Sequence, residues 1–303
     1  MSSARRLAAI DVGSNTVHLL VADVIDGRLR DVLHEVTMPR VGQAVNATGR
    51  VGPAKITEVA ADVRRLAALA REHSAETLLL GATEAVRRAA DRDAVLRAAS
   101  EAAGVPCQVI PAEVEARLSF RGATGAHPAG GPVLVADIGG GSTECVLGEG
   151  GRVSALASVP VGSGTATDRW MVSDPPGPAE RTACATGVRS ALVEAPDGVA
   201  ETGIVTGGTA TTLPWLLGRE ASGELDGGDV AMCRHRLARH PSPVIAARHR
   251  IDPVRARVLA GGVEIVAAVM ERYAMTRLIV SRAGVRDGMI LAYVEKGDAW
   301  VEG

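Results

Sequence analysis

Aromatic residues are almost missing from this chain: its 303 residues include three tryptophans, two tyrosines and one phenylalanine, together 2%. Hydrophobic residues nonetheless make up 47% of the sequence, so the cores must be built from Ala, Val, Leu and Ile. Proteins that bind single-stranded nucleic acid stack the bases on aromatic side chains, and this chain offers few. Its formal net charge of −2 also argues against a surface that coats a nucleic acid. Composition therefore disfavours nucleic acid as a partner.

Cysteines are few and scattered. No CxxC pair is formed by the four cysteines, Cys107, Cys145, Cys184 and Cys233, so neither a disulfide framework nor a zinc site is expected. We expect buried thiols in a reducing compartment instead. The segment before Asp11 carries two arginines and only a few apolar residues. It predicts neither a signal peptide nor a membrane anchor. We therefore expect a cytoplasmic protein that does not enter a membrane.

Lysine is nearly absent as well. Only Lys55 and Lys296 occur among the 33 basic residues, and the others are arginines, which bind phosphate bidentately and stay charged. Biased codon usage is the favoured explanation of the arginines, and phosphate binding stays open as the alternative. The sequence also lacks a Walker loop, GxxxxGK[ST], and any pattern typical of a Ser-His-Asp triad. Those absences exclude two common ways of doing phosphate and acyl chemistry.

What the sequence does contain is one glycine-rich turn with an acidic residue on each side. Residues 135–144 read VADIGGGSTE: an apolar run, Asp137, three glycines (Gly139, Gly140 and Gly141), Ser142, Thr143 and Glu144, and then a second apolar run. This pattern predicts a strand, a tight turn and a returning strand. Glycines in such a turn accept positive φ and let backbone N–H groups approach an anion. Asp137 and Glu144 are candidates to hold a divalent cation and a water against it.

The same pattern occurs earlier. Residues 7–21 read LAAIDVGSNTVHLLV, with Asp11 before Gly13, Ser14, Asn15 and Thr16. Asp11 and Asp137 are 137 − 11 = 126 residues apart, so the chain is expected to hold two similar domains, each beginning with this hairpin. One phosphate loop from each domain would clamp a polyphosphorylated ligand. His18, after the first loop, is expected to be a half-buried strand residue.

Periodicity and turn residues predict a βββαβα order for each half. Residues 40–50 are expected to be a loop, Asp91 to cap a helix, and residues 124–131 to be the hinge between domains. The expected strands are 7–12, 17–24, 29–37, 77–81, 107–110, 203–206 and 277–281, and the expected helices are 53–71, 91–103, one from about 112, 179–195, one near 211, 253–273 and one from 287. A basic stretch within 229–252 is expected to be a solvated helical face.

These motifs resemble the phosphate loops of the exopolyphosphatase/guanosine pentaphosphate phosphohydrolase family. The resemblance continues through TEAVRRAADRD (83–93), EVEARLSF (113–120), SDPP (173–176), TGGTATTL (206–213) and VRDGMILAYV (285–294), so it spans essentially the whole chain. It implies an α/β fold of two actin-like (ribonuclease H-like) domains around a central cleft, as in sugar kinases, Hsp70 and actin. We expect domain I over 1–124, domain II over 125–288, and a last helix over about 289–303 that packs back on domain I.

The resemblance also assigns roles. Glu115, the glutamate before Ala-Arg, matches the family's general base, and Arg87 matches an arginine that reaches phosphate. Asp137 and Glu144, with Asp11 from the other domain, would be ligands of Mg²⁺, with Mn²⁺ as a substitute and K⁺ as a further ion. Gly208 and Thr209 of the third loop, Gly207–Thr209, would contact phosphate, or that loop merely turns the chain. Gln43 and Val114 stand where the family has acidic residues.

The implied activity is hydrolysis of the terminal phosphoanhydride of inorganic polyphosphate, of short chains, because no third domain is present. The alternative is removal of the 5′ phosphate of guanosine pentaphosphate (pppGpp) or of another nucleotide, which would link the protein to the stringent response. An acetate or sugar kinase, and a non-catalytic sensor of polyphosphate or alarmone, are further readings. The family resemblance also implies a homodimer.

Overall fold

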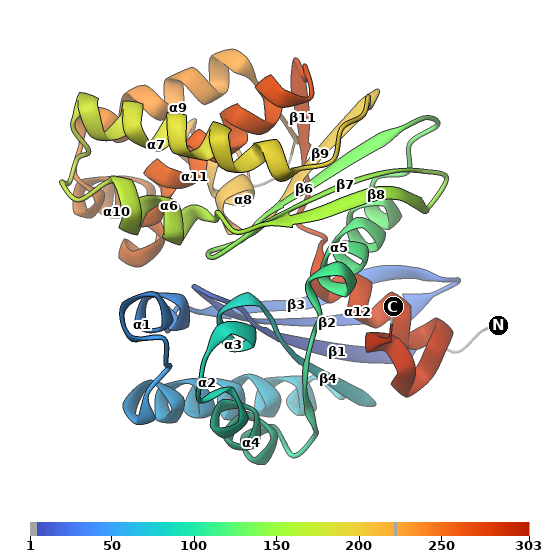
Figure 1. The fold of residues 1–303 in the computed structure, drawn as a ribbon. Helices are drawn as coiled ribbons and strands as arrows, with labels where there is room; N and C mark the ends of the chain where they lie inside the picture. The colour runs from blue at the N-terminus through green and yellow to red at the C-terminus, as the bar shows by residue number, and fades with distance from the viewer. Residues whose placement is uncertain (1–4, 221–222, 303) are drawn as a thin grey trace. The chain divides into compact units, whose positions relative to one another are not determined.

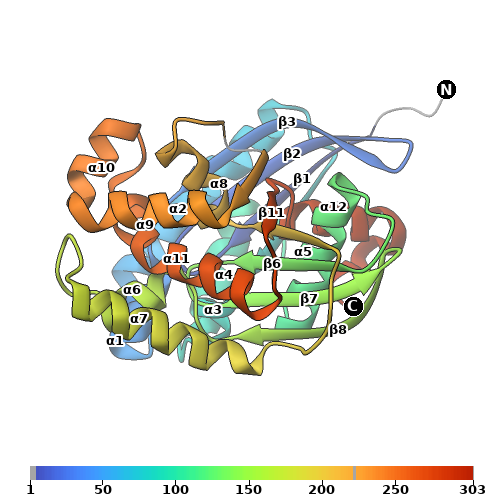
Figure 2. The same ribbon diagram turned by 90° about the horizontal axis from the view of Figure 1, so that it is seen from above.

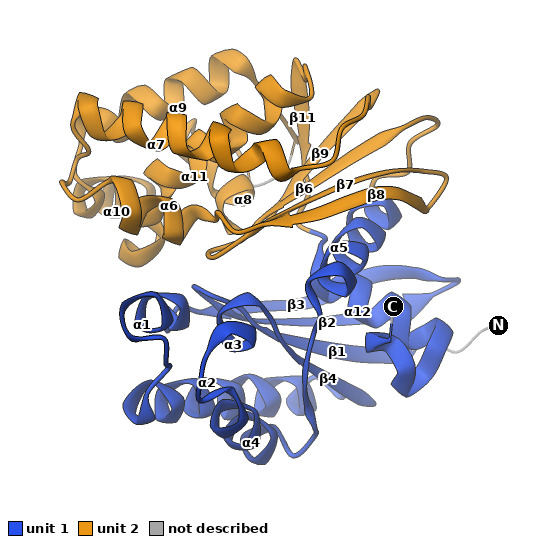
Figure 3. Cartoon of the chain, in the orientation of Figure 1, with its two compact units in different colours: residues 1–126, 283–303 blue, residues 127–282 orange. Residues whose placement is uncertain are grey.

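The structure, a computed structural model, describes residues 5–220 and 223–302. Residues 1–4 of the N-terminal segment and residue 303 of the predicted last helix lie outside it. The chain divides into two compact units (Figure 3): unit 1 comprises Met1–Ala126 and Ala283–Gly303, and unit 2 comprises His127–Arg282. The sequence put these boundaries at 124/125 and 288/289. They move because one helix continues to Ala126 and another begins at Val285, so the predicted hinge starts within a helix.

Unit 1 contains a five-stranded sheet. Its strand order is β3 (Arg28–Thr37), β2 (Val17–Ile25), β1 (Arg5–Val12), β4 (Thr77–Ala82) and β5 (Cys107–Val109). The first three strands are antiparallel, and β4 and β5 join them in parallel. A parallel neighbour needs a crossover connection, which is usually a helix. The βββαβα order that the sequence predicted is present, and β5 follows it.

Alternating residues of β1 face two different helical layers in unit 1 (Figure 1). Ala8, Ile10 and Val12 pack with α2 (Pro53–Glu72) and α4 (Arg92–Ala103), whereas Leu7 and Ala9 pack with α5 (Ala112–Ala126) and α12 (Val285–Lys296). Successive strand side chains point to opposite faces, so each face of this sheet is buried. A 3₁₀ turn, Gly297–Val301, follows α12. The predicted return of the C-terminus to domain I therefore begins four residues earlier than expected, at Val285.

Helices α5 and α12 pack with their backbones in contact. A side chain at Gly288 would lie 2.0 Å from the carbonyl oxygen of Leu118, and one at Gly122 would lie 2.1 Å from that of Gly284. Only glycine permits this approach. The packing fixes α5, which carries Glu115 in its first turn.

Unit 2 contains a six-stranded sheet of the same plan (Figures 1 and 2). Its order is β10 (Gly223–Asp226), β11 (Arg277–Val280), β9 (Thr202–Thr206), β6 (Val133–Ile138), β7 (Thr143–Glu149) and β8 (Arg152–Val159). The antiparallel β6–β7–β8 set and the parallel β9 repeat β1–β2–β3 and β4. β10 has no counterpart in unit 1 and was not predicted.

A long buried helix, α11 (Pro253–Arg272), organises the helices of unit 2. It packs against each of the others, which are α6 (Ser163–Trp170), α7 (Pro178–Ala191), α8 (Gly208–Leu216), α9 (Gly227–Arg239) and α10 (Ser242–His249), and against a 3₁₀ turn, Leu192–Glu194. Thirteen of its residues are buried, two of them glycines in contact with threonines: Gly261 with Thr167 and Gly262 with Thr209. The core of this unit is thus aliphatic, as the composition requires.

Three short helices escaped the sequence reasoning. The predicted loop 40–50 contains α1 (Val41–Thr48), the TEAVR segment forms α3 (Glu84–Arg88), and α6 follows β8. Each is too short for a convincing period of 3.6. Asp91 stands before α4 as predicted, but its carboxylate does not cap that helix; it accepts hydrogen bonds from the N–H groups of Val51 and Gly52, at 2.8 and 2.9 Å.

The fold class is confirmed: two α/β units that repeat one plan, each built on a mixed sheet. The central cleft stays a prediction. Within the described ranges 5–220 and 223–302, no helix is long and apolar enough to cross a membrane.

Candidate active site

The two predicted loops occupy equivalent places in their units. Asp11 is the last but one residue of β1, opposite His18 on β2 and beside Gly81 on β4. Asp137 lies near the end of β6, opposite Glu144 on β7 and beside Thr206 on β9. Residues directly opposite in an antiparallel pair have Cβ atoms roughly 5 Å apart on one face. Asp137 and Glu144 are therefore adjacent carboxylates, and His18, half-buried in β2 as predicted, takes the place of the second one in unit 1.

Loop 2 (Gly139–Ser142) is held by the first turn of α6. The N–H of Ser163 donates to the carbonyl of Gly139 at 2.9 Å, and the N–H groups of Gly164 and Thr165 donate to that of Gly140 at 2.9 and 3.1 Å. In a trans peptide the C=O and the following N–H point in opposite directions. With the carbonyls directed at α6, the N–H groups of the next residues, Gly140 and Gly141, point away from it. An anion on that side meets only donors.

Loop 1 (Gly13–Thr16) is held in the same way by the start of α1. The N–H of Gly42 donates to the carbonyl of Ser14 at 2.7 Å, and the N–H of Arg40 donates to that of Asn15 at 3.1 Å. The N–H groups of Asn15 and Thr16 therefore point away from α1. In each unit, N–H groups at the start of the helix that follows the third strand donate to carbonyls of the loop. Neither helix was predicted from the sequence.

The first glycine of each loop does not act as predicted. The N–H of Gly13 donates to the carbonyl of Thr16 at 2.9 Å, and the N–H of Gly139 donates to that of Ser142 at 3.0 Å, so both are used within the hairpin. Neither glycine has the positive φ that was expected. Their lack of a side chain matters instead, because a Cβ at either position would lie 3.2 Å from the same carbonyl oxygen. The anion-facing donors are consequently the next residues of each loop.

Glu144 is buried beside a hydroxyl donor. Its side chain is 2% exposed, and Oε1 accepts a hydrogen bond from Ser158 Oγ on β8 at 2.6 Å. Within the described parts of the chain, no group of three or more His, Cys, Asp or Glu side chains is placed to hold a metal ion. Mg²⁺ commonly takes one or two carboxylates and completes its shell with substrate phosphates and water. The Asp137–Glu144 pair fits that ion, whereas Asp11 belongs to the other unit.

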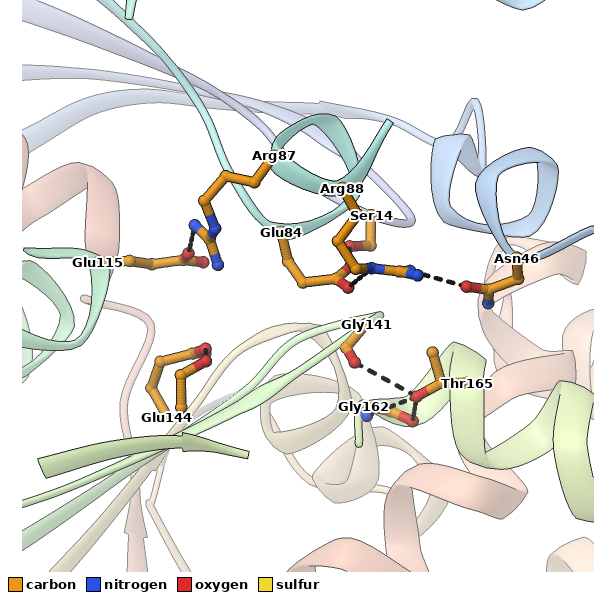
Figure 4. Close-up of polar contacts among 11 residues, drawn as sticks. Ser14, Asn46, Glu84, Arg87, Arg88, Glu115, Gly141, Glu144, Gly162 and Thr165 are labelled. Atoms are coloured by element: carbon orange, nitrogen blue, oxygen red, sulfur yellow. Dashed lines mark hydrogen bonds and ion pairs between the residues drawn. The ribbon is translucent and has the colours of Figure 1, made fainter. Parts of the chain in front are cut away.

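Glu115 and Arg87 form a buried ion pair in unit 1 (Figure 4). Glu115, only 7% exposed, accepts a hydrogen bond at Oε2 from Arg87 Nη1 at 2.5 Å, and the same nitrogen donates to the carbonyl of Ile110 at 2.7 Å. Arg87, predicted to reach phosphate, thus holds the candidate base in place.

A second buried carboxylate, absent from the prediction, supports loop 1. Ser14 Oγ donates to Glu84 Oε2 at 2.7 Å, Arg88 Nε donates to the other carboxylate oxygen, and Arg88 Nη2 donates to Asn46 Oδ1 on α1 at 2.8 Å (Figure 4). Arg88 is itself exposed, with its head group reaching over to the buried Glu84. Only the charge pair at i and i+4 of TEAVRR could have pointed to Glu84 and Arg88.

The third predicted loop is built around Gly207, which has a φ of 94° and whose Cβ would lie 2.4 Å from the carbonyl oxygen of Ile138. Thr209 is 3% exposed, with its side chain against α11 at Gly262. Its hydroxyl is therefore packed in the core, and only the backbone of Gly208 and Thr209, in the first turn of α8, is left for a ligand. Arg255 lies against Gly208, where a Cβ would meet its Nη1 at 1.8 Å; sequence reasoning passed over this arginine.

The basic stretch forms α9 and α10, and two of its basic side chains reach the carbonyl groups at the end of α8. Arg236 donates to the carbonyl of Leu216, and His249 Nδ1 lies 3.1 Å from that of Trp215. Burial lowers the pKa of His249, so its ring is neutral at pH 7. These contacts satisfy orphan carbonyls of a helix end. They agree with the predicted helical face and not with a polyanion site.

Packing explains one of the two substituted positions, and nothing in the structure explains the other. Val114, where the family has an acidic residue, is buried with Ile110, Leu118 and Met289. Gln43 is exposed on α1. The four cysteines are unpaired, and three of them are buried as predicted, whereas Cys107 is partly buried. Burial raises the pKa of Cys145 and Cys184 to about 12.

Fold, duplicated loops and paired carboxylates together define a phosphate-transferring α/β protein. The profile of the Ppx/GppA phosphatase family matches residues 20–296, and the chain belongs to that family. It is 35% identical over 313 aligned positions to exopolyphosphatase 2 of Mycobacterium tuberculosis, covering 95% of this chain and 98% of that protein.

Solved structures agree. An exopolyphosphatase-like protein matches with a TM-score of 0.88 at 28% identity, covering 96% of this chain and 98% of that one. The Ppx/GppA family member of Aquifex aeolicus matches with a TM-score of 0.81 at 29% identity, covering 97% and 99%.

Proposed function

We propose that this protein is an exopolyphosphatase that hydrolyses the terminal phosphoanhydride bond of inorganic polyphosphate and releases orthophosphate. Its relationship to exopolyphosphatase 2 over nearly the full length of both chains supports the substrate. The observation that carries the chemistry is the repeated loop, in each unit bound through its carbonyls by a helix so that successive N–H groups face one way. Such donors neutralise charge on the oxygens of a phosphoryl group in transfer.

The reaction needs a base for the attacking water, and Glu115 is the candidate. A water oxygen attacks the terminal phosphorus, Glu115 accepts its proton, and the bond to the bridging oxygen breaks, leaving a polyphosphate shorter by one unit. Arg87 holds Glu115 by their ion pair and fixes the direction of its second oxygen. The loop amides of Asn15 and Thr16 in unit 1 and of Gly140 and Gly141 in unit 2 would bind phosphate oxygens.

Asp137 and Glu144 would hold Mg²⁺, which neutralises phosphate charge when bound. Glu144 is kept in place for this by the hydroxyl of Ser158. A homodimer and a cytoplasmic location complete the proposal; the unpaired cysteines suit a reducing compartment.

The substrate is tested by measuring phosphate release from polyphosphates of defined length, from pppGpp, and from ATP with and without acetate or a sugar. The expected result is the highest kcat/KM on polyphosphate, with short chains turned over as well as long ones. Release from pppGpp alone would move the protein to the nucleotide branch of the family. ADP formation that depends on an added acceptor would make it a kinase.

A further inference from the structure

The side chain of Ser14 lies inside unit 1. Ser14 is 6% exposed, and its Oγ reaches Glu84 on α3, which is 8% exposed. α1 closes the other side: the N–H of Gly42 binds the carbonyl of Ser14, and a Cβ at Gly42 would lie 3.1 Å from the Cβ of Ser14. Both the backbone and the side chain of this loop residue are therefore tied to helices of its own unit.

The chemistry of the two groups decides which of them donates the hydrogen bond. An ionised carboxylate only accepts, and a hydroxyl has one proton to give. Ser14 gives that proton to Glu84 at 2.7 Å. While the bond holds, Ser14 Oγ has no proton left to donate to a phosphate oxygen, so the structure does not support a role for this hydroxyl as a donor to substrate.

A buried carboxylate beside an anion-binding loop also needs its charge offset. Glu84 receives Arg88 on its other oxygen, and Arg88 reaches Asn46 on α1. The chain Ser14–Glu84–Arg88–Asn46 thus joins loop 1 to the helix that binds its carbonyl (Figure 4).

We propose that Glu84 is a positioning residue of loop 1: by taking the Ser14 proton it fixes the loop so that the N–H groups of Asn15 and Thr16 are preorganised for phosphate. Arg88 keeps the charge of Glu84 from repelling the substrate. This inference rests on the proposed function, because it assigns the phosphate contact to the loop backbone and not to the serine hydroxyl.

The test is a double-mutant cycle with Ser14→Ala, Glu84→Ala and the double variant, following kcat and KM on polyphosphate. Each single variant is expected to lower kcat by about 10- to 100-fold, since misplacement by roughly 1 Å has effects of that size. The double variant should be no worse than the poorer single one, because both remove the same link. Glu101→Ala, an exposed glutamate on α4, is the matched control and should behave as wild type.

Two further variants separate positioning from a loss of fold. Glu84→Gln retains an oxygen that accepts the Ser14 proton, so it should recover most of kcat. Arg88→Ala leaves the carboxylate uncompensated and should raise KM with kcat largely kept. Additive effects of Ser14→Ala and Glu84→Ala, or a Ser14→Ala variant with unchanged kcat, would overturn the proposal.

Failure of the proposed function has a different signature. Wild-type protein would then release no phosphate from any polyphosphate, and the cycle would be read by calorimetric binding of tripolyphosphate instead. Ser14→Ala and Glu84→Ala should weaken that binding equally and non-additively. No binding by the wild type would contradict both proposals together.

Discussion

Gly162, the residue before α6, is where a single methyl group should disrupt loop 2. A Cβ there would lie 2.5 Å from the carbonyl carbon of Gly140, 2.6 Å from the nitrogen of Gly141 and 2.7 Å from the carbonyl oxygen of Gly139. All three are backbone atoms, so no side chain can swing away. Reaching ordinary contact requires a displacement of roughly 1 Å.

That displacement is enough to break the bonds between α6 and the loop. The N–H groups of Ser163, Gly164 and Thr165 donate at 2.9–3.1 Å, and 1 Å more takes them past hydrogen-bonding range. Three backbone bonds at about 1 kcal/mol each agree with the roughly 1–3 kcal/mol typical of overpacking. Gly162→Ala should therefore destabilise unit 2 by about 2–3 kcal/mol and lower kcat about 100-fold by misplacing the amides.

The assay is denaturant unfolding together with phosphate release from polyphosphate. Gly130→Ala is the matched control, because a Cβ at Gly130 has nothing within 4 Å; it should change neither quantity. A Gly162→Ala protein as stable and as active as the Gly130→Ala protein would refute the claim that α6 positions loop 2.

Three further predictions concern unit 1. Gly288→Ala places a methyl group 2.0 Å from the carbonyl oxygen of Leu118 and should lower the free energy of unfolding by roughly 1–3 kcal/mol. The control is Gly125→Ala, whose methyl group would lie 3.4 Å from the flexible end of Leu291. It should be neutral or slightly stabilising in the same melt. Burial raises the pKa of Asp287 above 3.8, against the opposing effect of Arg286 and with Asp31 and His34 also near. The contribution of Asp287 to stability should therefore be lost as pH rises above 3.8. Asp287→Asn, which still accepts from Gly284, should be more stable than wild type at pH 7 and equal to it at pH 3. Hydrogen bonds from Arg6 and Arg30 lower the pKa of Asp23 from 3.8 to about 2. The contribution of Asp23 to stability is therefore present above pH 3.8 and lost as pH falls towards 2. Asp23→Asn should lower the melting temperature at pH 7 and leave it unchanged below pH 2, and a pH-independent difference would contradict the ion-pair explanation.

The strands and the long helices could be predicted from the sequence because the patterns that indicate them are local. The alternation of β1 and the apolar stripe of α2 predicted both elements to within two residues. The matching turns at Asp11 and Asp137 predicted the duplication, and the two sheets repeat it in every strand except the added β10. Such features require only nearest-neighbour chemistry and periodicity.

The supports of the site could not be found that way. The first turns of α1 and α6 act through backbone N–H groups, which carry no residue signature, so Gly42 and Gly162 looked like ordinary loop glycines. Gly139 was assigned a positive φ and a phosphate contact, whereas its N–H closes the hairpin onto Ser142. Glu84 meets Ser14 across 70 residues, and no local pattern reports a contact of that range.

The most direct test of the central claim is Glu115→Gln, assayed for Mg²⁺-dependent phosphate release from polyphosphate and for tripolyphosphate binding. Glutamine keeps the size of the side chain and an acceptor for Arg87 but does not take the proton from water. Glu113→Gln, an exposed carboxylate two residues earlier on α5, is the control. The account predicts that Glu115→Gln loses about 10²- to 10⁴-fold in kcat while binding tripolyphosphate as the wild type does, and that Glu113→Gln is unaffected. Near wild-type turnover by Glu115→Gln would contradict the assignment of Glu115 as the base.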